Sequence, residues 1–65
     1  MEPTIGRLVH YVNNGIIRPA LIMEVLDDNK VSLNIFLPGT EIYMQNVEYS
    51  QEYADDKWSW PPRAT

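Results

Sequence analysis

Residues 31–37 are Val-Ser-Leu-Asn-Ile-Phe-Leu, and this stretch decides the fold because large aliphatic residues occupy every second position in it. Side chains on a β-strand alternate between the two faces of the sheet, so a period of two over these positions predicts a strand. We expect the four aliphatic residues to face the core. The residues between them, Ser32, Asn34 and Phe36, are then expected on the outer face.

Turn signals flank this strand and connect it to two more. Asp27–Lys30 is a turn by composition, and residues 38–40 (Pro-Gly-Thr) fit a type II turn, in which glycine accepts a positive φ. A strand from about Ala20 to Leu26 precedes the first turn, since Pro19 cannot donate to a sheet ladder and belongs at a strand start or an edge. A strand from about Glu41 to Val47 or Tyr49 follows the second turn. The three strands are predicted to form a meander.

The N-terminal region adds a first strand. Ile5–Val12 is rich in β-branched and aromatic residues, and the Asn-Asn-Gly sequence at 13–15 is a turn signal.

The C-terminal region is less regular. Ser50–Lys57 is polar and acidic, which predicts a loop or a single helical turn. An alternative is a short amphipathic helix over Ser50–Asp56 with Tyr53 packed inward. Trp58-Ser59-Trp60 places both indoles on one face if it is extended, and residues 61–65 are expected to form a loose tail.

The length of 65 residues, 7.6 kDa, allows one small domain over residues 1–65. The chain has no cysteine and one histidine, which excludes disulfides and cysteine-based zinc or iron–sulfur sites. Four or five short strands predict an all-β fold: a small SH3-like barrel or a strongly bent antiparallel sheet of 4–5 strands. A flat four-stranded sheet covered by dimerisation is the alternative. So small a core also favours a homo-oligomer.

The charge balance narrows the class of partner. The net charge is −4, and five acids but no base occur between Glu41 and Asp56. Binding to duplex nucleic acid favours a basic face, so we expect no such partner. No apolar run reaches the ~20 residues that span a bilayer, and the N-terminus lacks a signal-peptide pattern. We therefore expect no membrane partner and a location in a reducing cytoplasm.

Catalytic groups are sparse. His10 is the only histidine, no nucleophile motif accompanies it, and the three glycines are scattered at positions 6, 15 and 39. The acid pairs Asp27-Asp28 and Asp55-Asp56 lie in polar turns. We expect a protein that is not an enzyme and that uses no cofactor or metal.

Bulky side chains occupy both faces of the first two predicted strands. Leu8, His10 and Val12 alternate with Arg7, Val9 and Tyr11, and the second strand is apolar on both sides. A half-exposed sheet is polar on one face. Long loops lying over a barrel would explain this pattern, but a homo-oligomer that buries the second face explains it better.

The candidate ligand-binding residues are those able to stack on a planar group, hold phosphate or carboxylate, or donate hydrogen bonds to a ligand. For each aromatic residue the alternative is a place in the core, and at least one tryptophan is expected there. The candidates are His10, Tyr11, Arg18, Asn34, Phe36, Asn46, Trp58, Trp60 and Arg63.

An ordered series of short motifs covers nearly the whole chain. It includes Gly6-Arg7-Leu8-Val9-His10-Tyr11, Arg18-Pro19-Ala20 and Trp58-Ser59-Trp60-Pro61-Pro62. The series resembles a group of small phage- and prophage-encoded proteins, which usually carry histidine where this chain has Ser59. The resemblance implies a viral origin and a compact β-domain, and it supplies no reaction.

Two functions from different classes follow. The chain could sequester a nucleotide-type immune signal of the host, such as a cyclic nucleotide or an ADP-ribose derivative, in pockets where subunits meet. Alternatively, it could be a protein–protein module that inhibits a host defence or replication protein, with the acids between Glu41 and Asp56 mimicking nucleic-acid charge. A virion component and a binder of single-stranded nucleic acid through Trp58 and Trp60 are further possibilities.

Overall fold

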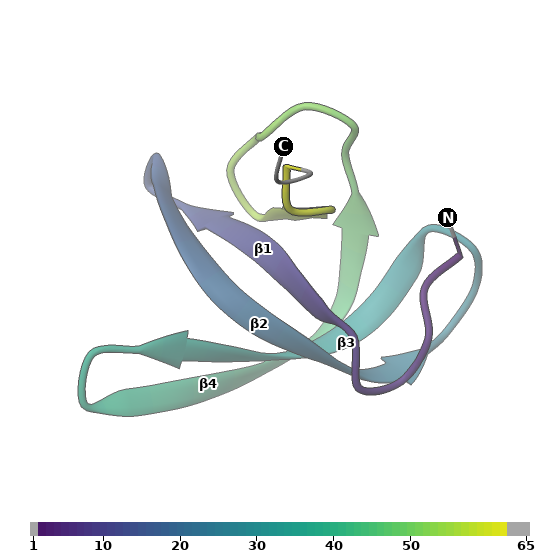
Figure 1. The fold of residues 1–65 in the computed structure, drawn as a ribbon, viewed down its shortest axis with the longest axis horizontal. Helices are drawn as coiled ribbons and strands as arrows, with labels where there is room; N and C mark the ends of the chain where they lie inside the picture. Colours follow the sequence, from purple (N-terminus) through teal and green to yellow (C-terminus); the bar gives the residue numbers. More distant parts are fainter. Residues whose placement is uncertain (1, 63–65) are drawn as a thin grey trace.

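The computed structural model of the chain describes residues 2–62, which form five β-strands closed into a small barrel (Figure 1). No helix occurs among these residues. The strands follow one another around the barrel in chain order: β1 (Leu8–Asn13), β2 (Ile16–Val25), β3 (Lys30–Leu37), β4 (Thr40–Tyr49) and β5 (Lys57–Ser59). The predicted all-β barrel is confirmed, and the flat sheet is wrong for this chain.

The short strand β5 closes the barrel by joining its two ends. It pairs antiparallel with β1, where Trp58 lies opposite Tyr11, and parallel with β4, where Trp58 lies opposite Tyr49. All other strand pairs are antiparallel. The sheet therefore departs from the purely antiparallel prediction only at β5.

The core consists of the side chains that alternate onto the inner face. In β3 the residues Val31, Leu33 and Ile35 are buried as the period of two predicts, whereas Leu37 is only half-buried. The other strands complete the cluster with Val9, Tyr11, Ala20, Ile22, Val47 and Trp58. One tryptophan, Trp58, is thus a core residue, at 1% exposure.

The second strand begins earlier than predicted, at Ile16, and Pro19 lies inside it. Pro19 is opposite His10 of β1, while pairing of β2 with β3 begins only at Ala20. On the side away from β1, Pro19 therefore has no strand partner, and a proline without an N–H is tolerated at such an edge position. The first strand begins later than predicted, at Leu8, after a turn at Gly6 whose φ is +89°.

Ser32 departs from its predicted exposure, because it is fully buried. Both neighbouring strands bulge opposite this residue: β2 has the extra residue Met23 between Ile22 and Glu24, and β4 has Gln45 and Asn46 where β3 has Ser32 alone. Bulges of this kind bend a strand and increase its twist. Burial in β3 therefore does not alternate at Ser32, because Val31 and Leu33 on either side of it are buried as well.

The segment between β4 and β5 is a loop, as one of the two predictions had it. The alternative helix with Tyr53 packed inward is wrong, because Tyr53 is 40% exposed. Asp55 Oδ1 accepts a hydrogen bond of 2.8 Å from the backbone N–H of Gly15, which ties the loop to the β1–β2 turn. Of the predicted tail, residues 63–65 lie outside the described residues.

Candidate functional site

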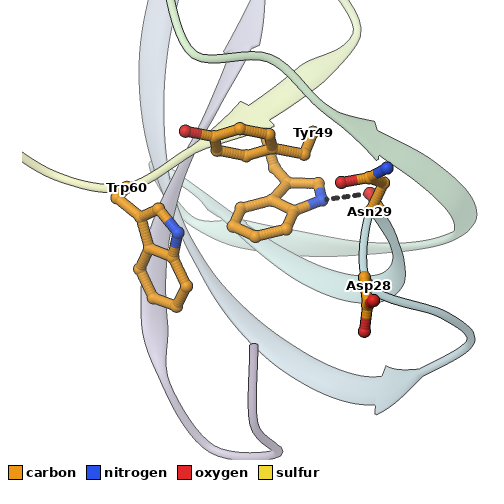
Figure 2. A pocket seen from close by; sticks show the side chains of 5 residues that line it. Asp28, Asn29, Tyr49 and Trp60 are labelled. Atoms are coloured by element: carbon orange, nitrogen blue, oxygen red, sulfur yellow. Dashed lines mark hydrogen bonds between the residues drawn. The ribbon is translucent and has the colours of Figure 1, made fainter. Parts of the chain in front are cut away.

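A pocket of about 180 Å³ opens where the β2–β3 turn meets the ends of β4 and β5 (Figure 2). We call it the aromatic pocket. Its walls combine three aromatic rings with two polar side chains, from Asp28, Asn29, Tyr49, Trp58 and Trp60. Figure 2 shows Asp28 and Asn29 on the opposite side of the opening from Trp60.

The polar wall is held in place by a tightly bonded turn. Asp27 Oδ1 accepts hydrogen bonds from the backbone N–H groups of Asn29, at 2.7 Å, and Lys30, at 2.8 Å. These two bonds lower the pKa of Asp27, because they stabilise its ionised form. The carbonyl oxygen of Asn29 in turn accepts from the Tyr49 N–H, at 2.8 Å, and from Trp58 Nε1, at 3.1 Å. The turn is thus fixed to the aromatic wall before any ligand arrives.

The aromatic wall is equally ordered. The ring centroids of Tyr49 and Trp58 are 4.9 Å apart and inclined by 59°, and those of Trp58 and Trp60 are 5.3 Å apart in an edge-to-face contact. Both distances lie in the range that stabilises aromatic pairs. Because Trp58 is buried and Trp60 is only partly buried, Trp60 is the tryptophan that offers ring surface to a ligand.

The charge of the pocket is negative. Asp28 supplies a carboxylate, and the lining described by the structure contains no lysine or arginine. The Cζ of Arg7 lies 5.5 Å from the centroid of the Trp60 ring. This distance is typical of a cation–π contact. The chain thus already holds one guanidinium against Trp60.

Two of the sequence-predicted ligand residues, Trp58 and Trp60, lie together in the aromatic pocket. The prediction that both indoles share one face agrees with their contact. Trp60 Nε1 has no hydrogen-bond partner within residues 2–62, whereas Trp58 Nε1 is bonded to Asn29.

Tyr11, His10 and Arg18 lie elsewhere. Tyr11 is a core residue whose hydroxyl donates to Asp56 Oδ1 at 3.0 Å. Burial first, and then the hydrogen bond and the charges of Asp56 and Asp55, raise the pKa of Tyr11 to about 12. His10 Nδ1 lies 2.8 Å from the Tyr53 hydroxyl. Arg18, opposite Tyr11 on β2, has a buried Nε without a hydrogen-bond partner in the described chain.

The remaining predicted ligand residues do not join the aromatic pocket. Asn34 and Phe36 are half-buried on β3, opposite Tyr43 and Glu41 of β4. Asn46 is exposed at the β4 bulge with a φ of +58°. Arg63 lies outside the described residues.

The acids proposed as a nucleic-acid mimic are largely engaged within the chain. Glu48 forms an ion pair of 2.7 Å with Lys57, which lowers the pKa of Glu48. Asp55 and Asp56 accept hydrogen bonds from Gly15 and Tyr11. All five acids nevertheless remain exposed, and only Glu48 is paired with a cation among the described residues.

Sequence reasoning missed Asp28, Asn29 and Tyr49. The first two were assigned only to a turn, and Tyr49 only to the end of a strand. These residues reach the tryptophans through the parallel pairing of β5 with β4, and no local sequence pattern indicated that pairing. No group of three or more metal-ligating side chains occurs among the described residues.

Comparison of the chain with protein-family models, curated proteins and solved structures finds no match. No helix within residues 2–62 has the length and apolar character needed to cross a membrane.

Proposed function

We propose that the chain is a non-catalytic binding module that holds an arginine side chain of a partner protein in the aromatic pocket. One observation carries the proposal: three aromatic rings and the Asp28 carboxylate surround the opening, and its described lining contains no base. Aromatic faces attract cations, and a carboxylate accepts two parallel hydrogen bonds from a guanidinium. Arg7 on the Trp60 ring is an example of the same contact within the chain.

The volume of the pocket also favours a side chain over a larger ligand. Sites for drug-sized molecules occupy about 300–1,000 Å³, whereas this pocket has about 180 Å³. The head of an arginine fits such a space, but a whole nucleotide does not. With the resemblance to phage proteins, we place the module in the cytoplasm of an infected bacterial cell, where it would occupy and inhibit a host defence or replication protein.

Capture of a nucleotide-type signal is the second candidate. It is favoured by the partly exposed Trp60 ring, on which a base could stack, and by the Asn29 amide, which could bond a base edge. The Asp28 carboxylate disfavours nucleotide binding, because its negative charge repels the phosphate groups. A second copy of the chain would have to supply the missing volume and the missing cations.

Calorimetric titration with three peptides tests the proposal. A short peptide with a central arginine should bind, its lysine counterpart should bind more weakly, and its citrulline counterpart, which has the same shape without the charge, should not bind. Asp28→Asn should weaken binding about tenfold, the loss expected for a charge-assisted pair. Trp60→Ala should abolish it, while Glu52→Gln, a matched charge change on an exposed loop residue, should not alter it.

Equal affinity for arginine and citrulline, or indifference to Asp28→Asn, would overturn the proposal. Titrations with cyclic dinucleotides, cyclic trinucleotides and ADP-ribose derivatives separate the second candidate. Micromolar binding of one of these that is lost in Trp60→Ala would replace the first function with nucleotide capture.

A further inference from the structure

The outer part of β4 is a strand edge without a partner. β4 pairs with β5 only at Glu48 and Tyr49, and all seven residues of Thr40–Asn46 are exposed. Figure 1 shows this end of the β3–β4 hairpin projecting away from the rest of the barrel. A long, exposed edge of this kind readily pairs with another strand, and proteins usually protect it with charge, proline or a covering segment. Only one residue of this edge, Glu41, is charged.

We propose that two copies of the chain pair through this edge, β4 against β4, in an antiparallel arrangement centred on Tyr43. The inference is independent of the function proposed for the aromatic pocket. It names a second copy as the partner because the sequence of the edge is self-complementary.

Symmetry restricts the register. Two identical antiparallel strands in one sheet are related by a twofold axis normal to that sheet, and this axis must pass through a residue pair, because opposite side chains point to the same face. An axis at Tyr43 sets Ile42 opposite Met44 of the other copy and Glu41 opposite Gln45. An axis at Ile42 would instead set Met44 opposite Thr40, and one at Met44 would set Ile42 opposite Asn46.

Only the Tyr43 register gives both Ile42 and Met44 an apolar partner on the inner face, since each of the other two registers leaves one of them opposite a polar residue. There Ile42 and Met44 are 48% and 39% exposed in the single chain, and the pairing would cover both.

The distribution of charge also favours pairing of two copies through this edge. The chain has a net charge of −4, so two copies repel over most of their surfaces, but here the acid of each copy meets a neutral amide.

Cysteine cross-linking tests the register directly, because the chain has no native cysteine. Opposite residues in an antiparallel pair have Cα atoms about 4.5–5.5 Å apart, within reach of a disulfide, whereas diagonal neighbours are about 7–8 Å apart. On oxidation, Tyr43→Cys should form a covalent dimer. Ile42→Cys alone should not, but Ile42→Cys mixed with Met44→Cys should. Tyr53→Cys, a tyrosine of similar exposure in a loop, is the matched control that should stay monomeric.

Sedimentation equilibrium of charge variants gives a second, fold-preserving test at an exposed position. Gln45→Glu sets two acid pairs against each other per dimer and should raise the dimer dissociation constant about fivefold, whereas Gln45→Lys should lower it by a similar factor. A wild-type chain that stays at 7.6 kDa up to millimolar concentration would overturn the inference. So would a dimer whose cross-links fit another register, or one that is indifferent to both charges at residue 45.

Discussion

Tyr11→Phe removes one hydroxyl from the core and should change how the stability of the barrel depends on alkaline pH. Tyr11 is 2% exposed, and its pKa is about 12 in the folded chain. Its pKa in the unfolded chain is about 10. Because the folded state holds the proton more tightly, the contribution of Tyr11 is complete below pH ~10 and is lost as the pH rises to ~12.

The size of the effect follows from the two pKa values. Their difference corresponds to about 3 kcal/mol. A chain of 65 residues has a total stability of only about 3–10 kcal/mol, so this loss is a large part of it. At pH 7 the variant should be less stable than the wild type by about 1 kcal/mol, because it lacks the hydrogen bond to Asp56. The two stabilities should therefore become equal near pH ~11, above which the variant is the more stable.

Urea unfolding at pH 7, 9, 10, 11 and 12, followed by circular dichroism, measures these stabilities. Tyr53→Phe serves as the control, because it removes a hydroxyl from a ring that is 40% exposed and should leave the wild-type slope. If Tyr11→Phe and the wild type lose stability in parallel between pH 10 and 12, the burial argument for Tyr11 is refuted.

Three further predictions concern stability. Ser32→Ala should stabilise the chain by about 1 kcal/mol in urea unfolding, because it removes a buried hydroxyl with no partner in the described chain; a loss of stability would contradict this. Gly39→Ala should lower the free energy of unfolding by about 1 kcal/mol, because Gly39 has a φ of +79°; an added Cβ would meet open space, so the backbone conformation alone accounts for the loss. An unchanged melting temperature would contradict this explanation. Asp27→Ala should lower the melting temperature at pH 7, and less so near pH 3, because the lowered pKa of Asp27 makes its contribution disappear as the pH falls; an equal loss at both pH values would exclude this mechanism.

Local patterns predicted the strands of the central meander well. The alternation in β3 placed Val31, Leu33 and Ile35 in the core, and the proline-glycine turn at 38–40 has its positive φ at Gly39. These features depend on residues adjacent in sequence. Pro19 misled the prediction because a proline is compatible with a strand where one edge is open, and that edge is a property of the assembled sheet.

The candidate site was predicted only in part for the same reason. Trp58 and Trp60 carry a local signal, since they are two residues apart on an extended segment. The other walls come from residues 28, 29 and 49, which reach the tryptophans only because β5 pairs with both β1 and β4. The burial of Ser32 likewise occurs where the two neighbouring strands, β2 and β4, bulge opposite it. The sequence pattern of one strand does not contain this information.

Whether the aromatic pocket binds a guanidinium is tested most directly by NMR. The two indole N–H signals of the chain, assigned with Trp60→Phe, are followed while an arginine peptide is added, with the citrulline peptide as the reference. We predict that the Trp60 indole and the backbone amides of Asp28 and Asn29 shift with arginine and stay fixed with citrulline. Unchanged signals at these positions, or shifts confined to residues around Arg18 and His10, would contradict the account.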